Sequence, residues 1–161
     1  MQHRGPDQSS FYKKILYNDV ILLGHNRLEI LDIAGGQQPM QCFDKTHIIV
    51  FNGEIYNHQE LRKELISKGY SFISNHSDTE VLLNGYKEWG DDLPNHLNGM
   101  WAFCIFDTLK RKLFLSRDRF GEKPLFYKLE KNTLIFSSEL NFFKEIANIN
   151  LEINYKNIQK Y

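Results

Sequence analysis

A continuous apolar run that ends at an asparagine–glycine pair constrains the fold more than any other stretch of this chain. Residues 47–51 form this run, which is typical of a strand covered on both faces. Asn52 and Gly53 follow, and Asn-Gly between apolar stretches is the strongest short signal for a tight hairpin turn. Residues 54–57, however, lead into a helical pattern instead of a returning strand. We therefore expect the strand to close at Asn52-Gly53 and a loop to carry the chain into a helix.

Two helices are predicted after this loop. Asn57 is a plausible N-cap for the first, its apolar residues repeat at helical spacing from Leu61, and Gly69 stands where a C-terminal cap belongs. The second begins at residues 77–80, whose Ser-x-x-Glu spacing is that of a capping box, and extends to Gly90.

Strands are predicted on both sides of the helices. Residues 20–31 indicate a strand and its exit, and a final helix is expected to begin at Ser138 or Glu139. Short strands are expected at residues 100–107, 112–116, 124–129 and 133–137, with a hairpin turn at 130–132. Strands in runs and helices in pairs favour antiparallel sheets covered by helices, which is an α+β fold.

Length and composition exclude several classes of protein. With 161 residues the chain suits one domain with a hydrophobic core. Lys plus Arg and Asp plus Glu number 20 each, so no net field attracts nucleic acid or an anionic membrane. No apolar run approaches the ~18 residues of a membrane helix. Cys42 and Cys104 are the only cysteines and are widely spaced, which predicts neither a disulfide framework nor a metal site and favours a cytoplasmic location.

Ten sequence blocks together resemble one known family. They are His-Arg-Gly-Pro-Asp at 3–7, Gly-His-Asn-Arg-Leu at 24–28, Gly-Gln-Gln-Pro-Met at 36–40, Asn-Gly-Glu-Ile-Tyr-Asn-His at 52–58, Leu-Arg at 61–62, Ser-Asp-Thr-Glu-Val at 77–81, Tyr-Lys-Glu-Trp-Gly at 86–90, Leu-Asn-Gly-Met-Trp-Ala-Phe at 97–103, Arg-Asp-Arg-Phe-Gly-Glu-Lys-Pro-Leu-Phe-Tyr at 117–127 and Ser-Ser-Glu at 137–139. In order and spacing they resemble the class II glutamine amidotransferase domain of glutamine-hydrolysing asparagine synthetase.

The resemblance implies an N-terminal-nucleophile-type fold. In that fold two antiparallel β-sheets lie between α-helical layers, forming a four-layer sandwich. The His-Arg-Gly-Pro-Asp block lies further from the start in the family, so the sandwich is expected to be incomplete at the N-terminus. We expect residues 1–148 to form a partial amidotransferase domain and residues 149–161 to begin a linker toward an absent synthetase domain.

The resemblance also implies a binding site for glutamine. Arg27 matches the arginine that clamps the α-carboxylate, which a planar guanidinium can hold through two hydrogen bonds. Asp78 matches the aspartate that receives the α-ammonium, although a carboxylate in a first helical turn is also stabilised by the helix dipole. Glu54 is expected to help with the same ammonium, and backbone groups of Ile30 and Leu31 are expected to contact the substrate.

Asn52 and Gly53 match the oxyanion hole of the family. Attack on the glutamine amide moves negative charge onto its carbonyl oxygen, and the Asn52 side-chain amide and the Gly53 N–H would meet that charge. Asn52 is counted among the glutamine-binding residues as well.

The nucleophile of the family is a cysteine at position one, whose own α-amino group is the general base. Here Gln2 follows the initial Met, and neither Cys42 nor Cys104 offers a free α-amine. We therefore expect this polypeptide to be inactive alone. The family's ATP, Mg²⁺ and aspartate sites belong to the synthetase domain, so no cofactor is expected here.

Three functions fit this reading of the sequence. The first is the glutaminase portion of an asparagine synthetase, which releases ammonia for asparagine biosynthesis. The second is a non-catalytic remnant that binds glutamine or a partner, and the third is an amidotransferase-like protein of surface-polysaccharide synthesis. L-Glutamine is the expected ligand, with a synthetase domain or subunit and a second copy of the chain as possible partners, and with no nucleic acid or membrane.

Overall fold

The computed structural model describes Gly5, residues 8–27 and residues 37–147, and it divides the chain into two compact units, Met1–Pro124 and Leu125–Tyr161. Every described sheet is antiparallel. Helices accompany these sheets in both units, which confirms the predicted α+β class. Ile30, Leu31 and the predicted linker at 149–161 lie outside the described residues.

A four-stranded sheet forms the centre of the first unit. Its strands lie in the order β3-β4-β5-β6, with β3 at Met40–Gln41, β4 at His47–Ile55, β5 at Gly99–Asp107 and β6 at Lys112–Arg117. The first five residues of β4 and the last seven of β5 are all buried. This burial confirms the prediction that the apolar run at 47–51 is covered on both faces.

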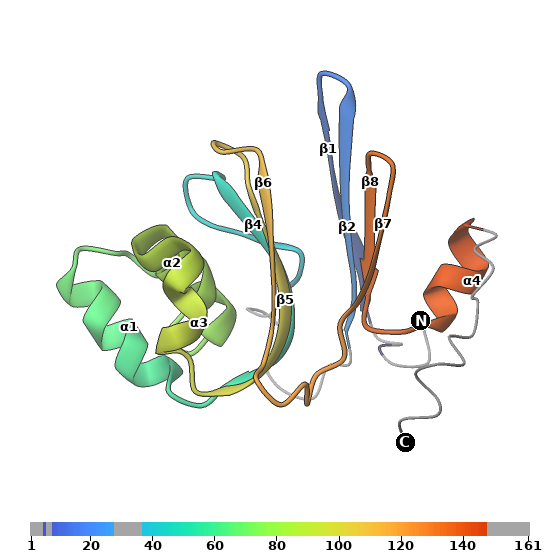
Figure 1. Ribbon diagram of the computed structural model, residues 1–161. Helices are drawn as coiled ribbons and strands as arrows, with labels where there is room; N and C mark the ends of the chain where they lie inside the picture. Colours follow the sequence, from blue (N-terminus) through green and yellow to red (C-terminus); the bar gives the residue numbers. More distant parts are fainter. Residues whose placement is uncertain (1–4, 6–7, 28–36, 148–161) are drawn as a thin grey trace. The chain divides into compact units, whose positions relative to one another are not determined.

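Helices cover one face of this sheet (Figure 1). They are α1 at His58–Ser67, α2 at Asp78–Trp89, the 3₁₀ turn η2 at Gly90–Asp92 and α3 at Leu93–His96. Leu65 and Leu82 of the helices join Ile49, Phe103 and Ile105 of the sheet in one hydrophobic core. Ser77 caps α2 as predicted, its side chain accepting from the Glu80 N–H.

A hairpin of β1, Gln8–Leu16, and β2, Asp19–Arg27, completes the described part of the first unit. The sequence did not predict β1. Its residues alternate between half-buried and exposed, and its apolar positions are interrupted by two lysines, so no apolar run marks it. The β2 strand contacts β4.

The second unit contains a second hairpin, formed by β7, Phe126–Glu130, and β8, Thr133–Ser137, followed by α4, Asn141–Ala147. The predicted turn at 130–132 is confirmed, with Lys131 at a φ of 50°. The final helix begins later than predicted, at Asn141.

One local prediction around the Asn-Gly pair is wrong. The β4 strand continues through Asn52 and Gly53 to Ile55, because β5 supplies a ladder partner for each of these residues. Pairing between strands thus overrides the turn preference of the dipeptide. Asn57 is the N-cap residue of α1, as predicted, but its side chain makes no capping hydrogen bond; it donates to His96 O and accepts from the Asn98 N–H, at 2.9 Å each.

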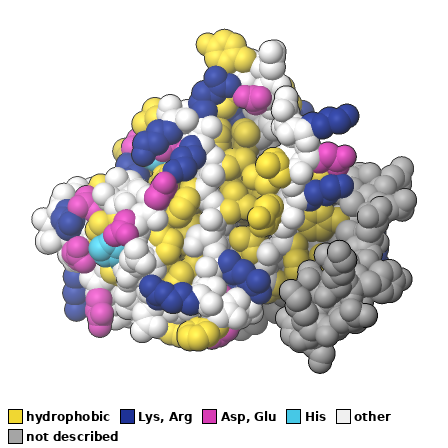
Figure 2. Space-filling model, in the orientation of Figure 1, with side chains coloured by type: hydrophobic (Ala, Val, Ile, Leu, Met, Phe, Trp, Pro, Cys, Tyr) yellow, Lys and Arg dark blue, Asp and Glu magenta, His cyan; other side chains and the backbone are white. Residues whose placement is uncertain are grey.

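Side chains of both charge signs are interspersed over the face shown in Figure 2. This distribution agrees with the zero net charge of the sequence. Within the described ranges, no helix has the length and apolar character needed to cross a membrane.

Candidate functional site

The outer edge of β4 carries the segment that the sequence singled out. The backbone N–H and C=O of Phe51 point away from β5, and both form hydrogen bonds with the Gln38 side chain. The Tyr56 N–H points in the opposite direction and donates to Asn98 O at 2.8 Å. Because backbone groups alternate in direction along a strand, the Gly53 N–H points to the same edge as that of Phe51. The N–H of Gly53 is therefore placed to donate to a ligand oxygen at this edge.

Gly53 is required by its close approach to β5. Its φ is +155°, and a Cβ added there would lie 2.8 Å from Trp101 Cα and would overlap Met100 O. Gly99, two residues before Trp101, has a φ of +152°, and a Cβ added to it would overlap Glu54 O and lie 3.0 Å from Ile55 Cα. The two glycines let β4 and β5 approach closely where the predicted oxyanion-hole residues stand.

Gln38 and His25 fix the start of this edge. The Gln38 side-chain amide accepts from the Phe51 N–H at 2.5 Å and donates to Phe51 O at 3.0 Å, so it replaces a neighbouring strand. His25 Nε2, from β2, lies 3.2 Å from the same carbonyl. Both residues belong to blocks that carry the family resemblance, but the blocks alone did not indicate what either side chain contacts.

Asp78 lies at the other end of the same edge. It is the first residue of α2, and its Oδ2 accepts from the Ile55 N–H at 3.2 Å. Burial raises the pKa of the Asp78 carboxyl above its ordinary value, although the Ile55 N–H and nearby His58 oppose the shift. A desolvated carboxylate at this end of the edge would be stabilised by a nearby cation.

The loop before Asp78 is fixed by two charged side chains, Arg62, to which sequence reasoning gave no role, and Glu80, which it placed in the capping box. Buried Arg62 donates to Ser74 O at 2.6 Å and to Ser77 O at 2.9 Å, and its guanidinium lies 4.2 Å from the centre of the Phe72 ring. Glu80 accepts from the N–H groups of Ile73 and Ser74 at 2.7 and 2.8 Å. Together they hold the start of α2 in place.

Asp118 supports β5 behind Gly53. Its buried carboxylate accepts backbone N–H groups from Trp101 at 3.3 Å, Phe120 at 3.1 Å, Glu122 at 2.9 Å and Lys123 at 3.0 Å. Burial opposes ionisation, yet these donors hold the pKa of Asp118 below its ordinary value. The Arg-Asp-Arg segment at 117–119 therefore has a structural task.

The structure brings some of the predicted site residues together. Asn52, Gly53 and Glu54 follow one another on β4, and Asp78 contacts the next residue, Ile55. Arg27 ends β2, two residues after His25, and its side chain lies outside the described part of the structure, as do Ile30 and Leu31. The binding roles of Arg27, Ile30 and Leu31, like those of the other site residues, stay predictions.

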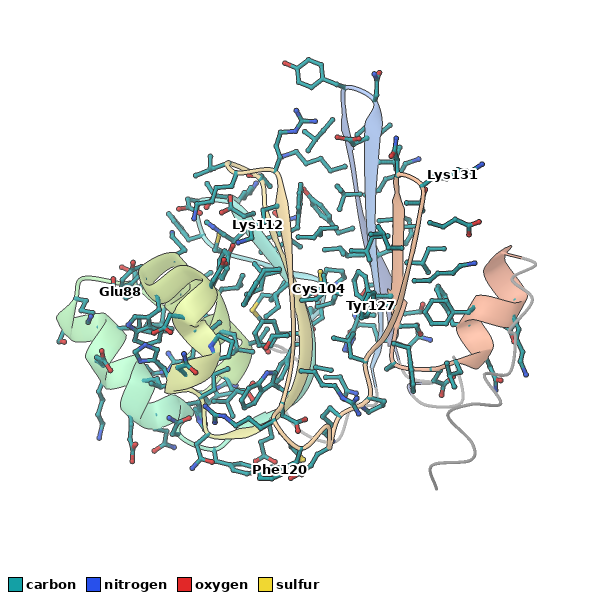
Figure 3. All side chains as sticks on the ribbon, in the orientation of Figure 1. Glu88, Cys104, Lys112, Phe120, Tyr127 and Lys131 are labelled. Carbon is teal, nitrogen blue, oxygen red and sulfur yellow. The ribbon has the colours of Figure 1, made fainter. Side chains whose placement is uncertain are left out.

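Both cysteines are buried. Cys104 lies on β5 within the central sheet (Figure 3), and burial raises the pKa of its thiol to about 12. Cys42 follows β3 and is 8% exposed. A thiol of such high pKa has almost no thiolate at neutral pH, so Cys104 is not a nucleophile.

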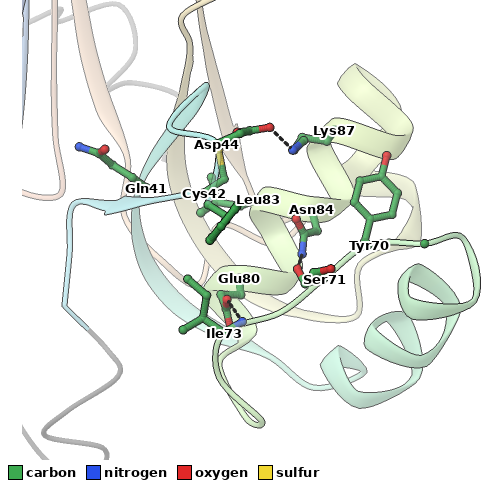
Figure 4. A pocket seen from close by; sticks show the side chains of 12 residues that line it. Gln41, Cys42, Asp44, Tyr70, Ser71, Ile73, Glu80, Leu83, Asn84 and Lys87 are labelled. Atoms are coloured by element: carbon green, nitrogen blue, oxygen red, sulfur yellow. Dashed lines mark hydrogen bonds and ion pairs between the residues drawn. The ribbon is translucent and has the colours of Figure 1, made fainter.

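A pocket of about 320 Å³ lies on the helix side, beside the loop that joins β3 to β4 (Figure 4). Cys42, Asp44, Tyr70, Glu80 and Lys87 are among its lining residues. The described residues that are predicted to bind glutamine, Asn52, Glu54 and Asp78, do not line it.

A family model described as a glutamine amidotransferase domain matches residues 1–161. The chain is 46% identical to asparagine synthetase [glutamine-hydrolyzing] 3 of Bacillus subtilis over 87% of its length and 22% of that protein. It is 40% identical to asparagine synthetase [glutamine-hydrolyzing] 1 of the same organism over 99% of its length and 24% of that protein. Asparagine synthetase B of Escherichia coli is 43% identical over 78% of the chain and 22% of the relative. The chain thus spans about a quarter of these relatives.

Among solved structures, the glutamine phosphoribosylpyrophosphate amidotransferase of B. subtilis aligns with a TM-score of 0.63 and 24% identity. The alignment covers 76% of this chain and 28% of that one. This likeness confirms the predicted N-terminal-nucleophile-type fold.

Proposed function

The chain belongs to the glutamine amidotransferase domain family, and we propose that it binds L-glutamine as the glutaminase portion of an asparagine synthetase. One observation supports this most strongly: the Asp78 carboxylate bonds to the Ile55 N–H and so lies beside the edge formed by residues 52–54. An acceptor for an ammonium and donors for an oxyanion are thereby placed along one edge of β4.

Each polar group of glutamine has an assigned partner in this proposal. Arg27 holds the α-carboxylate, and Asp78 accepts the α-ammonium with help from Glu54. The backbone of Ile30 and Leu31 contacts the substrate. The Asn52 amide and the Gly53 N–H face the carbonyl oxygen of the side-chain amide, where each donor contributes a factor of about 100 to 1000 in rate.

Neither thiol of the chain attacks this amide in the proposal. Cys104 is buried inside β5, and Cys42 stands at the start of the β3–β4 loop, ten residues before Asn52. Neither one carries the free α-amine that would act as its base. We infer that a polypeptide of these 161 residues binds glutamine without hydrolysing it.

The ammonia released by the full reaction would serve asparagine formation. The relatives bear the name asparagine synthetase [glutamine-hydrolyzing] and are about four times as long as the matched segment. We assign the ATP and Mg²⁺ sites to a separate synthetase domain that is the partner of this one.

Isothermal titration calorimetry with L-glutamine tests the proposal, because binding requires no nucleophile. The wild-type chain is expected to bind. Arg27→Ala is expected to weaken binding by about 10- to 100-fold, the equivalent of a charge-assisted hydrogen bond of about 1.5–3 kcal/mol. Arg111→Ala is the matched control, since Arg111 is an exposed arginine paired with Asp19 at 2.8 Å. Undiminished binding by Arg27→Ala would refute the clamp.

A further inference from the structure

We propose that the loop between β3 and β4 binds a divalent transition metal of the zinc class. The ligand atoms would be Cys42 Sγ, Asp44 Oδ1 and His47 Nδ1. Suitable ligand atoms of these three residues all lie within 4.8 Å of one another. The site is distinct from the proposed glutamine site, because His47 begins β4 whereas the glutamine edge lies at its other end.

Backbone hydrogen bonds prearrange the loop. Cys42 stands opposite His47 in continuation of the β3–β4 register, and the Cys42 N–H donates to His47 O at 3.0 Å. The Lys45 N–H donates to Cys42 O at 2.9 Å, with Lys45 at a φ of 56°. The His47 N–H donates to Cys42 Sγ at 3.1 Å, a contact that stabilises a thiolate. The ligands therefore need little reorganisation to bind an ion.

Two of the three distances between the ligand atoms are near those of a tetrahedral centre. Cys42 Sγ lies 2.9 Å from Asp44 Oδ1 and 4.0 Å from His47 Nδ1. Bonds of ordinary length to zinc place such ligands roughly 3.3–3.6 Å apart, so each of these two separations changes by only about half an ångström. Thr46 Oγ1 lies 2.6 Å from Asp44 Oδ1 and 2.8 Å from His47 Nδ1. This hydroxyl bridges the ligands in the absence of an ion.

Neighbouring residues orient the ligands. His47 Nε2 lies 3.5 Å from Asp107 Oδ2, and Asp107 is itself fixed by the N–H groups of Leu109 and Lys110 at 2.9 Å each. A carboxylate that accepts from one imidazole nitrogen leaves the other free to bind a metal. Lys87 Nζ holds Asp44 Oδ2 at 2.6 Å, so Oδ1 is the oxygen left for the ion.

The pocket supplies access and the remaining coordination positions. Cys42 and Asp44 line it together with Lys87, and Figure 4 shows these side chains at the edge of the loop. Water from the pocket can complete the coordination shell. A thiolate and an imidazole select zinc or cobalt over magnesium and calcium, which prefer oxygen ligands. On binding, Cys42 releases its thiol proton to solvent, and the ion's two positive charges meet the thiolate and the carboxylate.

Titration of the full, untagged chain with Co²⁺ in the absence of glutamine tests the site. The wild type is expected to develop a thiolate-to-cobalt charge-transfer band together with intense visible bands of tetrahedral cobalt, and one equivalent of Zn²⁺ is expected to remove both. Cys42→Ser, which is nearly isosteric, is expected to lose the charge-transfer band, whereas Cys104→Ser is expected to keep it. A wild type without this band, or a Cys42→Ser variant that retains it, would overturn the proposal.

Two carboxylate variants form a matched pair for affinity measurements with Zn²⁺. Asp44 and Asp91 are both exposed and both bonded to a lysine at 2.6 Å, Lys87 and Lys112 respectively. Asp44→Asn is expected to weaken Zn²⁺ binding by at least about tenfold, and Asp91→Asn is expected to leave it unchanged. Equal affinities for these two variants would contradict the assigned ligand set. Thermal melts without metal are expected to show that both variants are folded.

Discussion

Asp78 has two effects that oppose each other at the scale of one residue. Burial raises the pKa of its carboxyl, so the folded protein is destabilised by an ionised Asp78 at neutral pH. The same desolvated charge is what would attract the ammonium of an amino acid. A binding group of this kind lowers stability in return for affinity.

Asp78→Asn is therefore expected to raise the free energy of unfolding at neutral pH and to abolish glutamine binding. Because the folded pKa is raised, wild-type stability falls as pH rises from the ordinary aspartate pKa through the folded pKa. The free energy of unfolding falls by about 1.4 kcal/mol for each unit by which the folded pKa is raised, and Asp78→Asn lacks this decline. Urea unfolding at several pH values measures it, with the exposed Asp92→Asn as control. A variant that is less stable than wild type at neutral pH would contradict the account.

Gly53 provides the second prediction for a single residue. Gly53→Ala is expected to lower the free energy of unfolding by about 2–6 kcal/mol, because backbone strain of ~1–3 kcal/mol adds to an overlap with β5 of similar size. Gly69→Ala is the matched control, since Gly69 also has a positive φ, +92°, but has no atom within 4 Å of an added Cβ. That change should cost only about 1–2 kcal/mol. Equal losses in denaturant unfolding would show that the approach to β5 is unimportant.

Arg62 joins two elements of the first unit, α1 and the segment that precedes α2. Arg62→Lys is expected to lower the free energy of unfolding by about 1–3 kcal/mol, since a lysine cannot reach both Ser74 O and Ser77 O with one planar group. Glutamine binding should weaken as Asp78 loses its position.

The control for this change is Arg111→Lys, at an arginine whose side chain is half exposed. Its free energy of unfolding should stay within about 0.5 kcal/mol of wild type. Chemical denaturation and calorimetry on both variants measure the two effects. If Arg62→Lys matches Arg111→Lys in both the free energy of unfolding and the affinity for glutamine, the start of α2 does not depend on the guanidinium.

Elements marked by strong local signals could be predicted from the sequence. The capping pattern of Ser77 and Glu80 placed the start of α2, and an apolar run placed β4. Elements whose limits depend on distant partners were misjudged. The end of β4 is set by pairing with β5, and the Asn57 side chain makes no capping hydrogen bond at the start of α1 because it reaches His96 and Asn98.

The same distinction applies to the site. Asn52, Gly53 and Asp78 stand in recognisable blocks, so their proximity followed from the resemblance. The contacts of Gln38, His25 and Arg62 with backbone atoms 12 to 26 residues away could not be predicted, because no local pattern records them. The Cys42–His47 pair was overlooked for a different reason, since the histidine was counted as part of an apolar strand.

At the scale of the whole molecule, the two thiols separate binding from hydrolysis. Cys42→Ser and Cys104→Ser are each expected to bind glutamine as wild type does, because neither thiol takes part in the proposed site. Wild type and both variants are expected to release no ammonia above the rate without protein. Calorimetry and an ammonia assay measure these outcomes. Ammonia release by wild type that Cys42→Ser abolishes would show that this thiol is catalytic.

In the proposed function, one edge of β4, closed by Asp78, receives glutamine. Backbone amide chemical shifts of the ¹⁵N-labelled chain, followed during titration with L-glutamine, test it most directly. The account predicts saturable shifts at Gly53, Glu54, Ile55 and Asp78, with little change at residues 42–47 in the metal-binding loop. Unchanged resonances along this edge at saturating glutamine, or shifts confined to the loop and its pocket, would contradict it.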